Sequence, residues 1–132
     1  MKLSIIVCVL NEIKTIEKIL QKINDVELPN NIQKEIIVID NNSIDGTKEF
    51  LQKIQISENL KVFFQKKNFG KGNSIIKGIE ESSGDLIIFQ DADLEYDPKN
   101  YDKLINHLIK NNLDAVFGSR IKNDHTVFEY KI

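Results

Sequence analysis

Short apolar runs alternate along the chain with segments whose apolar residues recur every three or four positions. The first run is continuous and rich in Ile and Val, as expected for a strand that is buried on both faces of a parallel sheet. Five runs have the length of strands, and they cover residues 3–10, 35–40, 60–65, 86–90 and 114–118. This alternation predicts an α/β fold in three layers, α/β/α, with a mostly parallel sheet between the helices.

Helical periodicity separates these strands. Asn11 precedes the first helix and is expected to cap it. A third helix is predicted over 70–82, closed by Ser83 and Gly84, and a fourth begins at Pro98 and ends near Asn111. The inward faces are expected to carry the periodic apolar residues: Ile13, Ile16, Ile19, Leu20 and Ile23; Phe50, Leu51 and Ile54; Ile75, Ile76 and Ile79; and Tyr101, Leu104, Ile105, Leu108 and Ile109.

Polar residues follow the predicted strands at their carboxyl ends, where parallel α/β sheets bind ligands. A single site for a nucleotide and its phosphates is therefore expected at this edge of the sheet. The residues that the strands deliver there are Asn11 and Glu12, Asp40 and Asn41, Asp91 and Asp93, and Ser119 and Arg120.

The sequence Asp91-Ala92-Asp93 comes directly after what its apolar run predicts to be a buried central strand. In an extended chain, residues two apart point the same way, so both carboxylates would face one space. Two carboxylates so close repel unless a cation lies between them, and oxygen ligands suit Mg²⁺ or Mn²⁺. Glu95 would supply a third oxygen or bind a water on the metal.

These motifs also fit other interpretations. A solvated loop whose acids cap a helix remains an alternative for Asp91 and Asp93. An aspartate-nucleophile phosphatase is disfavoured, because its motif usually follows the first strand and carries Thr or Val where Leu94 stands. Dinucleotide binding is disfavoured because the first strand–helix turn has no glycine. The start of the third helix, Gly70-Lys71-Gly72, either contacts phosphates or forms a plain loop.

Composition narrows the class of protein. The chain has 132 residues and fits one globular domain, with 41% hydrophobic and 29% charged residues. A net charge of −2 gives no electrostatic case for nucleic-acid binding. Its one cysteine, Cys8, is expected to be a small buried hydrophobe. No apolar run approaches the ~20 residues of a membrane span, which predicts a soluble chain.

Five motifs in order and spacing resemble inverting glycosyltransferases of family 2, with the GT-A fold. The closest likeness is to polyprenyl-phosphate or dolichol-phosphate mannosyl- and glucosyltransferases. The motifs are LSIIVCVLNE at 3–12, EIIVIDNNSIDGT at 35–47, NFGKGNS at 68–74, GDLIIFQDADL at 84–94 and GSR at 118–120.

The resemblance implies roles for the matching residues. The nucleotide would contact residues from the first two strand ends: Cys8, Leu10, Asn11, Glu12, Ile39, Asp40 and Asn41. The metal on the sugar diphosphate would be held by Asp91 and Asp93, with the Ala92 backbone close by. Arg120, beside Ser119, would contact a phosphate of the donor or of the acceptor.

The chain departs from the usual family pattern at several of these positions. Cys8 and Leu10 stand where Pro and Tyr are usual, which alters base stacking. Asn41 and Asn42 replace an acidic–glycine pair, and Glu95 replaces a frequent Gln. Family domains also continue well past the GSR motif, so residues 1–132 are expected to be the N-terminal, donor-binding part of a longer domain.

The function implied is metal-dependent transfer of a hexose from a nucleotide-diphosphate sugar, of the GDP-mannose or UDP-glucose type, to a polyprenyl phosphate. The enzyme would work at the cytoplasmic face of a membrane, attached through segments outside this chain. Two alternatives stay open: a transferase that uses a saccharide acceptor in surface polysaccharide synthesis, and a non-catalytic nucleotide-sugar-binding module.

Overall fold

The computed structural model describes residues 1–54, 56–118 and 128–130. Four parallel strands form its main sheet in the order β3-β2-β1-β4, with β1 at Lys2–Val9, β2 at Gln33–Asp40, β3 at Leu60–Phe64 and β4 at Leu86–Asp91. A second sheet pairs β5, Ala115–Phe117, with β6, Phe128–Tyr130, in antiparallel fashion. The predicted parallel α/β sheet is confirmed.

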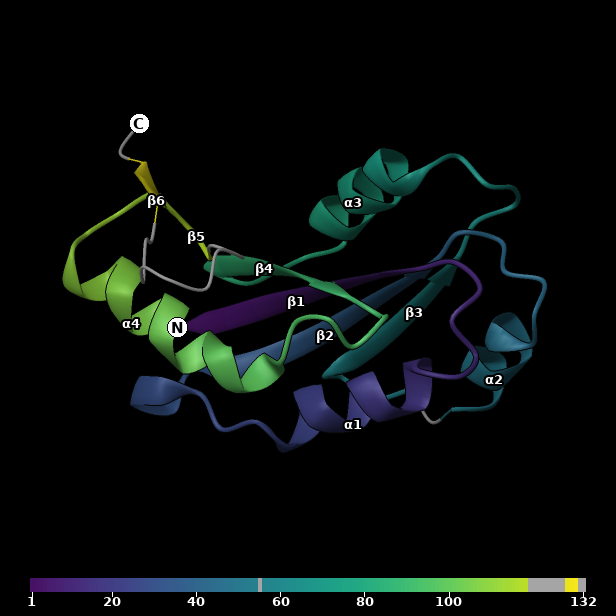
Figure 1. Ribbon diagram of the computed structural model, residues 1–132, viewed down its shortest axis with the longest axis horizontal. Coiled ribbons are helices and arrows are strands. Elements are labelled where there is room, and N and C mark those ends of the chain that lie inside the picture. The colour runs from purple at the N-terminus through teal and green to yellow at the C-terminus, as the bar shows by residue number, and fades with distance from the viewer. Residues whose placement is uncertain (55, 119–127, 131–132) are drawn as a thin grey trace.

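The helices cover both faces of the main sheet (Figure 1). α3, Lys71–Glu80, lies on one face, and α1, Ile16–Asp25, and α4, Tyr101–Lys110, lie on the other. α2, Thr47–Lys53, follows β2, and short 3-10 turns occupy Pro29–Asn31 and Pro98–Asn100. Within the described residues, no helix combines the length and the apolar character that crossing a bilayer requires.

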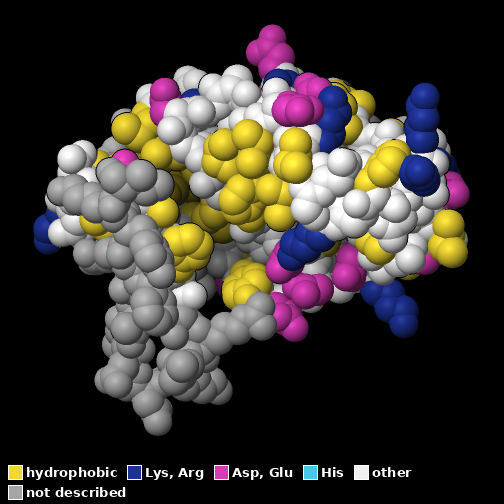
Figure 2. Space-filling model, turned by 90° about the horizontal axis from the view of Figure 1, so that it is seen from above, with side chains coloured by type: hydrophobic (Ala, Val, Ile, Leu, Met, Phe, Trp, Pro, Cys, Tyr) yellow, Lys and Arg dark blue, Asp and Glu magenta, His cyan; other side chains and the backbone are white. Residues whose placement is uncertain are grey.

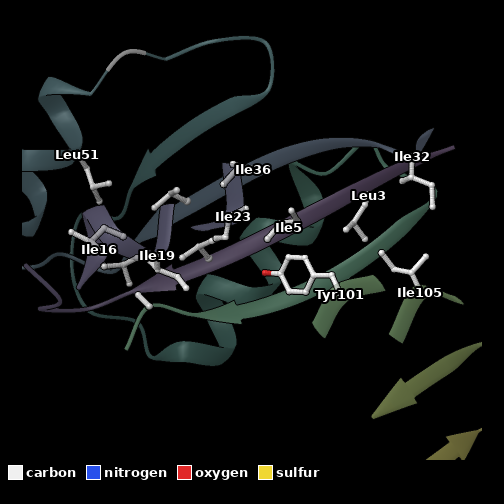
Figure 3. Packing of buried hydrophobic residues seen from close by; sticks show 14 residues of the cluster. Leu3, Ile5, Ile16, Ile19, Ile23, Ile32, Ile36, Leu51, Tyr101 and Ile105 are labelled. Carbon is white, nitrogen blue, oxygen red and sulfur yellow. The ribbon is translucent and has the colours of Figure 1, made fainter. Parts of the chain in front are cut away.

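The larger core lies between the sheet and the pair α1 and α4 (Figure 3). Alternate residues of β1 point into it, as the two-residue period of a strand requires. They meet the apolar faces predicted for the two helices, although Ile109, predicted on the inward face of α4, is 37% exposed. The shared core consists of Leu3, Ile5, Val7 and Val9 from β1, Ile16, Ile19 and Ile23 from α1, and Tyr101 and Ile105 from α4.

α3 packs against the sheet through small residues, so its predicted apolar stripe is wrong at Ile76 and Ile79, while Ile75 is half-buried. Ser74 and Gly78 are its buried positions, whereas Ile76 is 58% exposed and Ile79 43% exposed. Hydrophobic side chains are correspondingly visible on the face that carries α3 (Figure 2). The helix lies so close to β1 that a Cβ added at Gly78 would overlap Cγ2 of Ile6. The inward face of α3 is therefore the one whose small residues leave room for the Ile6 side chain, and apolar periodicity does not identify it.

Replacing Gly78 with alanine should therefore lower the free energy of unfolding by about 2 kcal/mol, because overpacking in a core costs about 1–3 kcal/mol. The matched control is Gly72→Ala in the same helix, where an added Cβ meets nothing within 4 Å. That change should leave the stability unchanged or slightly higher, since alanine is the better helix former. Urea denaturation of both variants measures the difference, and equal midpoints would contradict this packing.

The edge of the sheet also differs from expectation. The sequence predicts β4 as a buried central strand, but in the described part of the chain it is the edge strand beside β1. Ile87 is 41% exposed and Phe89 53% exposed on it. The fifth predicted strand, β5, does not extend the parallel sheet, because it pairs with β6 instead. A continuous apolar run thus predicts the strand correctly but not its place in the sheet.

Candidate functional site

An open pocket of about 370 Å³ lies at the carboxyl edge of the parallel sheet. The sheet register brings its walls together, because Cys8 of β1 pairs with Asp91 of β4 and Val9 pairs with Asp40 of β2. The start of α3 and the loop before it complete the pocket. The lining residues are Cys8, Val9, Leu10, Glu12, Asn41, Asn68, Gly70, Lys71, Ser74, Asp91, Ala92 and Asp93.

Asn11 joins the loops after β1 and β2, and the expectation that it caps α1 is wrong. Its backbone has a φ of 55°, its N–H donates to Ser43 Oγ at 2.9 Å, and its Oδ1 accepts from the Ile44 N–H at 2.8 Å. α1 begins later, at Ile16, with Thr15 in the N-cap position. Ile13 accordingly lies before the helix, and it is 39% exposed. Asn11 is not among the residues that line the pocket, and its contact with a nucleotide stays a prediction.

Glu12 is placed at the pocket by the same pair of loops. Its N–H donates to Thr47 Oγ1 at 2.9 Å, and its Oε2 accepts from Thr15 Oγ1 at 2.9 Å. The contact with Thr47 fixes the backbone of Glu12, and the contact with Thr15 restricts the rotamer of its carboxylate. Glu12 is therefore a preorganised acceptor, which is what recognition of a ribose hydroxyl or a base N–H requires.

Asp91, Ala92 and Asp93 are held in the pocket by a buried side chain beneath them. Gln90 is 2% exposed, and its Nε2 donates to the carbonyls of Asp91 and Tyr96, both at 3.0 Å. Its Oε1 accepts from the Tyr101 hydroxyl at 2.6 Å. This arrangement connects both ends of residues 91–96, the acidic loop, to α4. Sequence reasoning did not identify the Gln90–Tyr101 pair, although a glutamine inside an apolar strand run was a signal for it.

Lys71 forms an ion pair with the acidic loop. Its Nζ lies 2.5 Å from Asp91 Oδ1, and the two side chains are 62% and 30% exposed. The hydrogen bond to Asp91 raises the pKa of the Lys71 ammonium, against the opposing effect of burial. Lys71 thus carries a full positive charge at the mouth of a pocket that Glu12, Asp91 and Asp93 make acidic.

Cys8 contributes an unreactive side chain to the wall of the pocket. Burial raises the pKa of its thiol to about 11, with Lys71 lowering it and Asp91 raising it further. A thiol with this pKa is protonated near neutral pH, and the thiolate is the nucleophilic form. Cys8 therefore serves as a small apolar surface in the pocket, as its sequence context predicted.

Asn41 positions the loop that precedes α3. Its Nδ2 donates to Asn68 Oδ1 at 2.7 Å, and its Oδ1 accepts from the Phe69 N–H at 3.0 Å. Asn68 Oδ1 also accepts from the Gly70 N–H at 2.9 Å. A carboxylate at position 41 has no N–H to donate to Asn68, so asparagine is the residue that fits these contacts. Asn68 and Ser74 were not predicted, and their weak sequence signal was the polar loop and helix start around Gly70.

Ile39 and Asp40, which were expected in the base pocket, lie in the interior and are not among the residues that line it. Asp40 is fully buried, and its Oδ2 accepts from the Ser43 N–H at 3.2 Å. Its Oδ1 has no hydrogen-bond partner among the described residues. A buried acceptor left without a partner costs free energy.

Three predicted residues remain: Glu95, Ser119 and Arg120. Glu95 is exposed and does not line the pocket. The described residues contain no group of three His, Cys, Asp or Glu side chains placed to hold a metal ion, so Asp91, Asp93 and Glu95 do not form one. Ser119 and Arg120 lie outside the described residues.

The donor set still fits a hard divalent cation. Asp91 and Asp93 offer carboxylate oxygens, and Mg²⁺ commonly binds through one or two carboxylates, with substrate phosphates and water in its other positions. The Lys71 ammonium on Asp91 already shows that this carboxylate takes a cationic partner. With the polar amides on the opposite wall, the pocket has the chemistry to hold a nucleoside diphosphate.

Comparison with known proteins agrees with this geometry. The profile of glycosyl transferase family 2 matches residues 4–132. The dolichol-phosphate mannosyltransferase of Pyrococcus furiosus is 35% identical over 120 residues, which cover 91% of this chain but only 33% of that protein. The chain thus spans about a third of the length of this curated relative.

Solved structures share the fold. TarS of S. aureus superposes with a TM-score of 0.73 at 25% identity, covering 96% of this chain and 23% of that one. The mannosyltransferase PcManGT from Pyrobaculum calidifontis, solved in complex with GDP-Man and Mn²⁺, superposes with a TM-score of 0.69 at 22% identity, covering 80% and 32% respectively. The predicted GT-A architecture is confirmed.

Proposed function

The chain belongs to glycosyl transferase family 2, and from this premise we propose that residues 1–132 form the donor-binding part of a metal-dependent hexosyltransferase. The donor is a nucleotide-diphosphate sugar of the GDP-mannose or UDP-glucose type. The observation that carries the proposal is the pocket itself, which Asp91 at the end of β4 and Asp93 just after it line together with the end of β1 and the start of α3. A nucleotide-diphosphate sugar with its cation would use all of these groups.

In this proposal the nucleoside lies against the ends of β1 and β2. Glu12 accepts a hydrogen bond from it, and Cys8 and Leu10 give apolar contact. Asp40, which is fully buried, supports the neighbouring Asn41 from the interior. Asn41 acts through Asn68 by holding the loop in place. Ile39 supports this wall from the interior.

The diphosphate lies between β4 and α3. Asp91 and Asp93 would hold Mg²⁺ or Mn²⁺, and the structural neighbour PcManGT, which was solved with GDP-Man and Mn²⁺, supports this choice of cation. Such a cation supplies Lewis-acid neutralisation of the leaving diphosphate, an effect worth several kcal/mol. Lys71 and the N–H groups that begin α3 add positive potential on the opposite side. Ser119 and Arg120 remain proposed phosphate contacts.

We further propose a polyprenyl phosphate as the acceptor, supported by the name of the Pyrococcus furiosus relative. A phosphate monoester is ionised near pH 7, so its oxygen attacks the anomeric carbon without a general base. Such an acceptor places the complete enzyme at the cytoplasmic face of a membrane.

Thermal denaturation with a panel of nucleotide sugars, with and without Mn²⁺, tests the donor proposal. A donor at a hundredfold excess over its dissociation constant should add about 2.7 kcal/mol to the free energy of unfolding, and EDTA should remove most of this gain. The matching nucleoside monophosphates serve as controls. If they stabilise the chain as much as the sugar donors do, or if Mn²⁺ has no effect, the proposal is contradicted.

A further inference from the structure

Lys71 and Asp91 form an ion pair inside the pocket that has to bind the cation and the diphosphate. Asp91 Oδ1 lies 2.5 Å from Lys71 Nζ, so the ammonium stands where a metal ion on that oxygen would stand. Lys71 is the one basic side chain among the described residues that line the pocket. Asp91 Oδ1 cannot bind the Lys71 ammonium and a metal ion equally well at the same time.

The ion pair between Lys71 and Asp91 is weak enough to be replaced by other partners. Lys71 is 62% exposed and Asp91 30% exposed, and an exposed ion pair is worth only about 0–1 kcal/mol. The lysine ammonium sits on a flexible four-carbon stem, and this stem begins at the first residue of α3. An ammonium released there remains at the wall of the same pocket, within reach of a bound diphosphate.

Two opposite effects follow from this placement. Before the donor binds, the Lys71 charge competes with a divalent cation for Asp91 and repels it. Once a diphosphate occupies the pocket, its negative charge attracts both the Lys71 ammonium and the metal ion. The two cations then no longer compete for Asp91. Thermodynamic linkage requires the cation and the diphosphate then to increase each other's affinity by the same factor.

We propose that Lys71 is an exchangeable cation: it holds Asp91 while the pocket is without donor, and it transfers to the donor diphosphate when the metal ion takes its place. This makes the metal ion a weak ligand alone and a strong one with the nucleoside diphosphate. The inference rests on the proposed function. It adds a role for Lys71, which contacts first Asp91 and then the donor diphosphate and so couples metal binding to donor binding.

The test uses Lys71→Met, which keeps an unbranched side chain of similar length and removes its charge. The control is Lys66→Met, because Lys66 is exposed and lies outside the pocket lining. Electron paramagnetic resonance of free Mn²⁺ measures the affinity for Mn²⁺ alone, and calorimetry measures the affinity for GDP and UDP at saturating Mn²⁺. Circular dichroism verifies that both variants are folded.

Lys71→Met should bind Mn²⁺ alone about threefold or more tightly than the wild type, and it should bind the preferred diphosphate about five- to tenfold more weakly. Lys66→Met should change neither affinity. Unchanged or weaker Mn²⁺ binding in Lys71→Met, or an unchanged diphosphate affinity, would overturn the exchange. If the wild-type chain itself binds neither GDP nor UDP in a Mn²⁺-dependent way, the proposed function fails first, and the inference falls with it.

Discussion

Replacing Asp91 with asparagine should lower sugar transfer by the complete enzyme on the order of a thousandfold, the scale seen when one preorganised charge-stabilising group is removed. Asparagine keeps the shape of the side chain and removes its charge. A neutral amide is a poor ligand for a divalent cation, and it no longer attracts Lys71 from α3. Asp93→Asn should have a similar effect, because the two carboxylates together form the proposed metal site.

The measurement is the initial rate of transfer over a range of Mn²⁺ concentrations. Asp85→Asn is the matched control: it lies just before β4, at the end of the strand opposite the pocket, where its Oδ2 accepts from the Lys2 N–H. This control should keep its activity. If both pocket variants retained wild-type rates at every Mn²⁺ concentration, Asp91 and Asp93 would have no part in the reaction.

The largest effect on stability is expected at the other end of the sheet, where Glu35 is fully buried. Its Oε1 accepts from Ser4 Oγ and from the Ser83 N–H, both at 2.6 Å, and Ser83 Oγ donates to Oε2 at 3.0 Å. The ammonium groups of Lys2 and Lys61 lie 3.2 and 3.5 Å from Oε2. This cluster joins β1, β2 and the segment between α3 and β4.

Glu35→Ala should lower the free energy of unfolding by about 2–4 kcal/mol, because each buried donor left without an acceptor costs about 1–3 kcal/mol. Donors from Ser4 and Ser83 would remain buried without an acceptor. Urea denaturation measures the loss, with Glu58→Ala as an exposed control. Metal and nucleotide binding should survive in Glu35→Ala at low temperature, because the cluster lies far from the pocket. A loss below about 1 kcal/mol would contradict this account.

The Glu35 carboxylate should also make the free energy of unfolding depend on pH in the acidic range. Burial alone would raise the pKa of Glu35, but hydrogen bonds from Ser4, Ser83 and Lys2 outweigh burial and hold the pKa at about 2. A pKa lowered on folding contributes stability that is complete above the unfolded value, near 4.5, and that is lost as the pH falls towards 2. Glu35→Gln, which cannot titrate, should flatten the stability curve in this window. Equal slopes for the wild-type protein and the Glu35→Gln variant would contradict the prediction.

Much of the fold could be predicted from periodicity, because buried parallel strands are continuous apolar runs and α1 and α4 carry clear apolar faces. Position within the sheet could not be predicted in this way. β4 is as apolar as a central strand, yet Ile87 and Phe89 lie exposed at the edge. The inward face of α3 could not be predicted either. Gly78 faces inward because Ile6 leaves no room for a Cβ there, while Ile76 and Ile79 remain exposed.

The site was predictable where it depends on strand ends. Parallel register alone brings Cys8 beside Asp91, and the acidic motif follows that strand. Residues that act through loops could not be found, because their roles depend on contacts between distant segments. Asn41 reaches Asn68 across 27 positions, and Asn11 reaches Ile44 across 33. Gln90 and Tyr101 likewise meet only once α4 packs against the sheet.

The central claim is that a divalent cation joins Asp91 and Asp93 to a nucleoside diphosphate in this pocket. Crystals grown with Mn²⁺ and the preferred nucleoside diphosphate test it directly, because the anomalous signal of manganese locates the ion. The account predicts one strong peak within about 2–2.3 Å of carboxylate oxygens of both aspartates and of the diphosphate, the range of oxygen–metal bonds. Manganese bound elsewhere, or a diphosphate bound in the pocket with both aspartates turned away from it, would contradict the claim.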